Sequence, residues 1–485
     1  MPDLARLSEA KQKLFEMQRL GKLAPQSAQS AAAAAPVARK RESIAPMSLA
    51  QEQVWLRDQY ATAKARLYNE SITVKRSGPL DIAALEKSLA EVVRRHEIWR
   101  TTLDKIDGQP VQVIHPAAEN FHLPAVDLRH LPKHEREAEA LRIATAEAEL
   151  AFDVKTGPLL RVTLVTLDDE DHRLFLTAHQ STIDGVSVFE VFPTELTALY
   201  AAFAAGKESP LAPLPMQYAD FALWQRQWLA GSVLEEQMHY WQEQFAVELQ
   251  VLRWPAKRPP EETFRGALLP FDLSRQLTGA LRELGQREGI TLYAVLLAGF
   301  GALLSHYSGQ DDIIIGTVAP AGRKRAEFQK LLGYFLNPVP LRLDLSGDPN
   351  FTSLLRRAQK TTMGAISHDD VPLEHLARKF ISKPDPSRHP FFQNVISLAP
   401  SLAPLPAGWS MTPMDVESGG ARWDLYLELS DRPEGALGRA QYNPDIYDPS
   451  AMKQLLADFE KVLQSAAKNP ESKLSAILTA AFEKN

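Results

Sequence analysis

The chain has 485 residues and a formal net charge of −6, from 54 Lys and Arg against 60 Asp and Glu. Because neither sign dominates, binding to nucleic acid or another polyanion is disfavoured. The sequence contains no cysteine, which excludes disulfides, thiolate metal sites and a cysteine nucleophile, and suits a reducing cytosol. No apolar run approaches the ~18 residues of a membrane span, and no signal peptide is recognisable. We therefore expect a cytoplasmic protein without a membrane partner.

Residues 1–46 are expected to lie outside the folded body. Residues 7–20 place apolar side chains at helical spacing, with Ser8 at the start and Gly21 at the end. The following stretch to residue 46 is rich in Ala, Ser, Gln and Pro, which is typical of a flexible linker. The helix is interpreted either as a docking element for a partner protein or as an ordinary inter-domain remnant.

From Met47 onward, strand-like and helix-like segments alternate, and this alternation predicts an α/β fold. In the first half, Asp81 is a candidate cap for a helix whose apolar face includes Leu85 and Leu89. Residues 160–164 alternate between apolar and polar side chains, as in a half-buried strand. The chain is long enough for more than one such packed unit.

The second half has the same character, with two helices and a strand predicted at 276–288, 292–307 and 312–318. Pro-rich stretches at 209–215 and 254–261 mark the crossover between the halves. We accordingly divide the folded body into a first unit at 47–225 and a second unit at 226–485.

Polar residues gather at 179–185, between a strand-like segment and a run with apolar residues at helical spacing. Functional groups commonly occupy such connections, and the free N–H groups at a helix start would face this one. Taken alone, the pattern is more typical of a hydrogen-bonded structural histidine and an Asp-Gly turn than of a catalytic site. Pro193 is expected to kink the helix that follows.

Six further segments occur in a fixed order along the chain, at 48–51 with Trp55, 95–101, 218–225, 333–337, 368–374 and 387–393. Through these segments, about residues 47–480 resemble the condensation domains of nonribosomal peptide synthetases, within the chloramphenicol acetyltransferase-like superfamily. The resemblance implies two similar α/β lobes that form a V-shaped pseudodimer with a central tunnel. It also implies lobe contacts through a crossover near 387–394 and through a second bridge.

The central motif of this family is two adjacent histidines, three variable residues, then Asp-Gly. His179, Asp184 and Gly185 match that motif, whereas Gln180 replaces the second histidine, to which the family assigns deprotonation or positioning of the acceptor. Glutamine can donate and accept hydrogen bonds, but it cannot take up a proton. Loss of an imidazole base would raise the barrier by ~3–5.5 kcal/mol, unless another group or substrate positioning compensates.

The resemblance also implies roles for the neighbouring residues. Adjacent residues of an extended segment point in opposite directions, so we expect His179 to be buried and structural. In the family, an arginine holds the aspartate of the motif, and Arg100 and Arg323 are both candidates to hold Asp184. Gly185 is expected to permit close packing or a positive φ.

Three other motif residues are candidates for supporting the tunnel. Ser48 lies in the opening motif, and Trp224 is expected to be an aromatic of the core or of the lobe junction. Asn337 is interpreted either as a tunnel residue or as a turn residue before Pro338. The glycines of 316–323 lack the spacing of a phosphate-binding loop, which leaves a nucleotide site without support.

The resemblance implies a monomeric acyltransferase of a nonribosomal peptide or hybrid polyketide-peptide synthetase. It would join a carrier-bound acyl or peptidyl donor to a carrier-bound aminoacyl acceptor, with residues 7–20 docking on an upstream synthase subunit. No cofactor or metal ion is expected on this chain, because the phosphopantetheine belongs to the carrier proteins.

Three alternatives stay open. The first is a noncatalytic platform that recruits carrier proteins or tailoring enzymes. The second is that Gln180 was introduced into an ordinary catalyst to trap a substrate complex. The third, a minor one, is an ester-forming or acyl-CoA-dependent acyltransferase.

Overall fold

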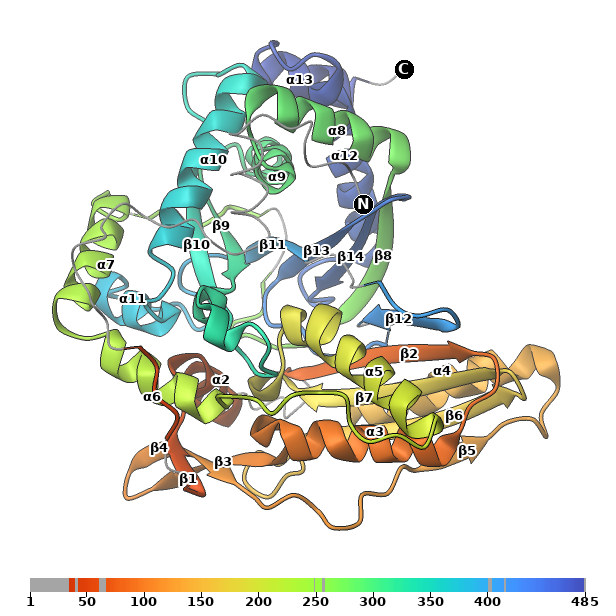
Figure 1. Ribbon diagram of the computed structural model, residues 1–485. Coiled ribbons are helices and arrows are strands. Elements are labelled where there is room, and N and C mark those ends of the chain that lie inside the picture. Colours follow the sequence, from red (N-terminus) through yellow and green to blue (C-terminus); the bar gives the residue numbers. More distant parts are fainter. Residues whose placement is uncertain are drawn as a thin grey trace.

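The computed structural model describes residues 35–39, 42–60, 67–247, 249–254, 258–399, 404–413 and 416–483. Within these ranges the strands form sheets of five, six and three strands, and helices cover the two larger sheets (Figure 1). This mixed architecture confirms the expected α/β class. The helix predicted at 7–20 lies outside the described residues.

The five-stranded sheet is built mainly from the first half of the chain. Its strands in spatial order are β12 (Trp409–Pro413), β2 (Asn69–Ser77), β7 (Asp171–His179), β6 (Leu160–Asp168) and β5 (Ala125–Asp127). All neighbouring pairs are antiparallel except β5 and β6. Strand β7 lies between β2 and β6, and its last residue, His179, lies at the end of the sheet where β6 begins.

Helices cover both faces of this sheet. Alternate strand residues such as Leu164 and Leu174 pack with α3 (Ile82–Arg95) and α5 (Phe192–Ala204). Their neighbours along the strands, such as Val165 and Phe175, pack with α4 (Lys133–Glu149). The period of two along a strand therefore divides the apolar residues between the two faces.

The six-stranded sheet comes from the second half of the chain. Its strands in spatial order are β10 (Asn337–Asp344), β9 (Asp312–Ala319), β11 (Asn394–Ala399), β13 (Leu425–Arg432), β14 (Gly435–Tyr442) and β8 (Ala267–Ser274). Only β11 runs parallel to its two neighbours. Helices α8 (Arg275–Glu288), α9 (Leu292–Ser308), α10 (Phe351–Ser367) and α12 (Pro449–Lys468) pack with it, and α13 (Leu474–Phe482) packs on α12 and α9.

The elements predicted in the second half are confirmed. The strand predicted at 312–318 is β9, and the apolar helix predicted at 292–307 is α9, which is buried along most of its length. Helix α8 stops where expected, because Gly289 adopts a left-handed conformation with φ 69°. Among the described residues no single helix is long and apolar enough to span a membrane; the pair α8 and α9 meets that test only together, across a 108° bend.

The predicted cap at Asp81 is confirmed, since its carboxylate accepts a 2.9 Å hydrogen bond from the backbone N–H of Ala84. Replacing Asp81 with alanine removes an acceptor for one free N–H group at the start of α3, and we expect a loss of about 1 kcal/mol of stability. Urea denaturation of Asp81→Ala and Asp81→Ser checks this, because serine is also a capping residue. Equal destabilisation by both variants would contradict the capping role.

The small sheet corrects the expected linker boundary. Its strands are β1 (Ile44–Pro46), β4 (Gln109–Ile114) and β3 (Thr101–Ile106), so residues 44–46 belong to the fold rather than to a linker. Arg39 is also held, because its backbone N–H donates to Asp220 over 2.8 Å and its side chain pairs with Glu97.

The contacts between the halves agree with two expectations, and the boundary between the units changes. Strand β12 comes from the second half and pairs with β2 of the first, as expected of a second bridge. Residues 387–394 lead into β11, and His389 among them lines a cavity together with residues of the first half. The position chosen to divide the units, 225/226, falls inside the unbroken helix α6 (Tyr218–Trp228), which α7 (Gly231–Gln244) follows.

Candidate functional site

The polar segment after β7 forms a short helical turn at Gln180–Thr182, and His179 lies directly before it. His179 is buried, and its ring lies edge-on to the rings of Tyr68 and Phe152. Its Nδ1 atom lies 2.7 Å from the Ser181 hydroxyl and accepts a 3.4 Å hydrogen bond from the Ser181 backbone N–H. Burial lowers the pKa of His179 to about 3. His179 is therefore a neutral packing residue at neutral pH, as expected.

Asp184 is held by Arg323 of the second half. The guanidinium reaches both carboxylate oxygens, at 2.8 Å from Nε and 2.7 Å from Nη2. Arg323 also donates to the Ser187 hydroxyl and to the backbone carbonyl of Leu331. Both partners of the pair are buried, and the guanidinium carbon lies 4.2 Å from the centre of the Phe335 ring. This ion pair connects the turn after β7 to the second half of the chain.

The structure decides two of the other expectations for this segment and leaves two as predictions. Arg100 is not the partner of Asp184, because its guanidinium lies 3.7 Å from Glu97 and donates to the carbonyl of His115. Gly185 lies in the helical start of the next segment and is not among the residues with positive φ, so close packing stays as its predicted role. Pro193 lies in the first turn of α5, directly after a π-helical turn at Ser187–Val191 and inside helical residues 185–204, and the kink expected there stays a prediction.

The side chain of Gln180 lies in a cavity of about 40 Å³, between residues of the first and second halves. The Oε1 atom of Gln180 is buried and has no hydrogen-bond partner. An unpaired buried acceptor is costly unless a ligand or water supplies a donor. A cavity of this volume has room for a group about the size of one water molecule. The walls also include Tyr68, Tyr334 and Pro338.

Three charged groups were not predicted as site residues but line the same cavity, namely Arg57, Glu374 and Arg422. Arg57 lies on α2 (Leu49–Tyr60) and pairs with Glu262 over 3.2 Å, whereas Arg422 pairs with Glu70 over 2.9 Å. Glu374 lies in the first turn of α11 (Leu373–Phe380), and its Oε2 atom is buried without a partner. The motif at 368–374 already contained Glu374, but its position near Gln180 follows only from the tertiary structure.

Asn337 and Ser48 support the surroundings of this cavity. The side-chain amide of Asn337, at the start of β10, donates 2.7 Å hydrogen bonds to the carbonyls of Asp369 and Val371. Asn337 thus orients the segment that leads into α11, and its neighbour Pro338 lines the cavity. The hydroxyl of Ser48 is fully buried and lies 2.8 Å from the Tyr218 hydroxyl.

Trp224 lies on α6 and stacks on Trp228, with 5.2 Å between the ring centres. The guanidinium carbon of Arg325 lies over the Trp224 ring, 5.4 Å from its centre. The Trp224 ring also contacts the ring of Phe328, so this tryptophan of α6 packs against the second half of the chain. It does not line the cavity at Gln180.

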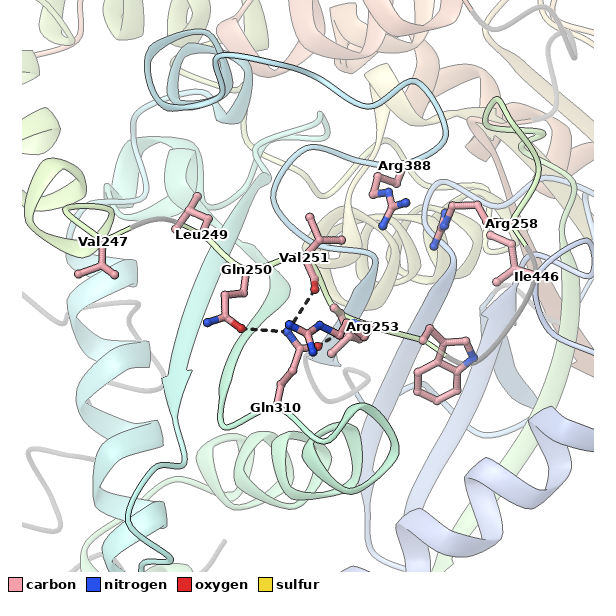
Figure 2. A pocket seen from close by; sticks show the side chains of 11 residues that line it. Val247, Leu249, Gln250, Val251, Arg253, Arg258, Gln310, Arg388 and Ile446 are labelled. Atoms are coloured by element: carbon pink, nitrogen blue, oxygen red, sulfur yellow. Dashed lines mark hydrogen bonds between the residues drawn. The ribbon is translucent and has the colours of Figure 1, made fainter.

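A larger cavity of about 730 Å³ lies in the second half (Figure 2). Figure 2 shows Arg253, Arg258 and Arg388 around it, together with Gln310, whose amide donates to Gln250 and to the Val251 carbonyl. None of the predicted site residues lines this cavity. Of the predicted site residues, Gln180 lines the smaller cavity, and Arg100 lines another cavity of about 630 Å³ in the first half.

Residues 41–485 match the family described as "Condensation domain". The chain belongs to the condensation domain family. One of the linear gramicidin synthase proteins of Brevibacillus parabrevis is 37% identical over 443 residues, which cover 90% of this chain but 6% of that protein. The chain therefore spans a small part of the length of this relative.

Two solved structures have folds similar to that of this chain. The X-domain in the complex of the X-domain and OxyB from teicoplanin biosynthesis has 27% sequence identity and a TM-score of 0.79, covering 93% of this chain and 99% of that chain. The first condensation domain of the calcium-dependent antibiotic synthetase, in complex with a substrate analogue, has 22% identity and a TM-score of 0.77, covering 90% and 99%. The second likeness is one of fold alone.

Proposed function

We propose that this condensation domain joins a carrier-bound acyl or peptidyl thioester to the amine of a carrier-bound aminoacyl acceptor, and so forms an amide. Condensation domains are in general amide-forming acyltransferases and work with carrier proteins in synthetase modules. The observation that carries the proposal is the buried, unpaired Oε1 atom of Gln180 in a small cavity lined by both halves of the chain. We further propose that this cavity lies within a tunnel between two lobes.

Gln180 takes the position of the second histidine of the family motif, and its amide provides positioning rather than proton transfer. Its unpaired Oε1 accepts an N–H of the incoming amine and holds the nitrogen against the thioester carbon. Orienting two bound reactants supplies a large part of the acceleration for an activated thioester and a neutral amine. The phosphopantetheine arms belong to the carrier proteins, and no cofactor is needed on this chain.

The test is intact-protein mass spectrometry of donor and acceptor carrier proteins, loaded with a panel of aminoacyl groups and mixed with this protein. We expect the donor acyl group to appear on the acceptor carrier with native Gln180. Gln180→His should change the initial rate by no more than ~10-fold, less than the ~10²–10⁴ that a missing general base costs. The exposed substitution Gln464→Ala is the control. Product only with Gln180→His would contradict catalysis by native Gln180.

A second candidate function is a platform that recruits other proteins without catalysing condensation. Two observations favour it: glutamine at position 180 cannot act as a base, and the similar X-domain is found in complex with OxyB. Carrier binding without product in any of the mixtures above would support this alternative.

We also propose that residues 7–20 dock on an upstream synthase subunit. A deletion that tests this proposal should end at residue 34, because Arg39 contacts Asp220 and Glu97 of the folded body.

A further inference from the structure

Two buried oxygen atoms without hydrogen-bond partners line the cavity at Gln180. They are Oε1 of Gln180 and Oε2 of Glu374, which come from opposite halves of the chain. We propose that Glu374 is the proton acceptor of the condensation step, and that it takes over the proton transfer that Gln180 cannot perform. This inference rests on the proposed amide formation and assigns a catalytic role to a second residue of the same site.

The other lining residues leave no alternative acceptor among the described residues. Arg57 and Arg422 are cations, and Gln53 and Gln180 are neutral amides without a titratable proton. The remaining lining groups with polar atoms are two phenols, one imidazole and one indole. Glu374 is the one carboxyl group in the set.

The phenols and the imidazole are poor acceptors for physical reasons. Burial raises the pKa of Tyr68 and of Tyr334, so both stay protonated. The Nδ1 atom of His389 accepts a 3.4 Å hydrogen bond from the backbone N–H of Phe391, which leaves Nε2 as the protonated nitrogen of the neutral ring. Burial also holds the pKa of His389 well below its usual value. His389 is therefore a donor rather than a base.

The surroundings of Glu374 suit a carboxylate that accepts a proton and then gives it up. Burial raises the pKa of Glu374, and Glu52 of α2 raises it further. Arg57 of α2 and Arg378 of its own helix act in the opposite direction and favour the ionised form. A carboxylate with a raised pKa is a stronger base than an exposed one, and the nearby cations keep it available in that form.

The position of Glu374 is fixed from the second half. Asn337 holds the carbonyls of Asp369 and Val371, and Lys324 lies 3.1 Å from the carboxylate of Asp370. Helix α11 begins directly after this braced segment, with Glu374 as its second residue. The Glu374 carboxylate therefore lies at the cavity on the first turn of α11, and the segment before this helix is held by hydrogen bonds and an ion pair.

The proposed step balances. The nitrogen lone pair of the acceptor amine forms the new C–N bond to the thioester carbon, and the amine proton passes to the Glu374 carboxylate. The C–S bond then breaks as the carbonyl re-forms. The departing sulfur receives the proton from the Glu374 carboxyl, which leaves an amide, a free thiol and an ionised Glu374. No oxidant, metal or nucleotide takes part.

The test measures initial rates of acyl transfer between the loaded carrier proteins across pH, for native protein, Glu374→Gln and Gln180→His, and for the double variant Gln180→His/Glu374→Gln. Glu374→Gln preserves shape and removes the acceptor. We expect it to lower the rate by ~10²–10⁴-fold and to remove the part of the acid-side fall that Glu374 causes, which leaves the fall caused by protonation of the acceptor amine. In the Gln180→His background the loss should be much smaller, because the imidazole supplies a base. His375→Gln, at the exposed next position of α11, is the matched control, and thermal melting reports folding.

The outcomes separate this inference from the proposed function. A rate for Glu374→Gln within ~3-fold of native, or one lowered equally at every pH, would overturn the role of Glu374 while leaving amide formation intact. Product from Gln180→His alone would also overturn it, since native Glu374 would then supply no base. The absence of product from every variant would reject the proposed function and, with it, the role of Glu374.

Discussion

Replacing Asp184 with alanine is expected to lower the free energy of unfolding by about 3–5 kcal/mol, because it leaves the buried guanidinium of Arg323 without its counter-ion. The Ser187 hydroxyl and the Leu331 carbonyl continue to accept from Arg323, but they carry no net charge. Asp184 also accepts the backbone N–H groups of Ser187 and Phe335, so the variant loosens the turn after β7 as well. Denaturant unfolding at neutral pH measures this loss.

A double-mutant cycle separates the ion pair from loss of packing. Arg323→Met removes the charge from the other side, and Asp184→Ala/Arg323→Met should be less destabilised than the sum of the single variants. The exposed pair of Asp127 and Arg129 provides the control, and Asp127→Ala should leave the melting temperature nearly unchanged. Simple additivity at 184 and 323 would show that the pair is not coupled.

Local elements of this fold were predictable because their signals are short-range. The Asp81 cap, the stop of α8 at Gly289 and the apolar helix α9 depend on neighbours within a few residues. Strand β12 was missed, since it is an edge strand of five residues whose partner, β2, lies more than three hundred positions earlier. No local pattern specifies that pairing.

The candidate site was predictable only in part for the same reason. The sequence pointed to the segment of Gln180 and Asp184 and left Arg100 and Arg323 as equal candidates for the ion pair. The choice depends on contacts between segments 139 residues apart. Glu374 was visible as a motif residue, but its approach to Gln180 results from the segment that Asn337 and Lys324 anchor.

Acidification is expected to destabilise the protein through His179. Its pKa is lowered to about 3 by burial, whereas in the unfolded chain it is about 6.5. Between these values the unfolded state binds the extra proton, so the stability contribution is complete above about pH 6.5 and is lost as the pH falls toward 3. At pH 5 the loss from this one residue is about 2 kcal/mol relative to pH 8.

Comparison with His179→Asn isolates this effect from the other titrating groups. Burial also lowers the pKa of His96, which adds to the acid loss, whereas burial raises the pKa of Asp369 to about 7, which opposes it. Asparagine retains an acceptor for Ser181 but cannot be protonated. The contributions of His96 and Asp369 are present in both proteins and cancel in the comparison. Urea unfolding at pH 8 and pH 5 should show a loss about 2 kcal/mol larger for the native protein than for His179→Asn. Equal losses would mean that His179 is protonated, or reaches water, in the folded state, and its assignment as a neutral packing residue would then be wrong.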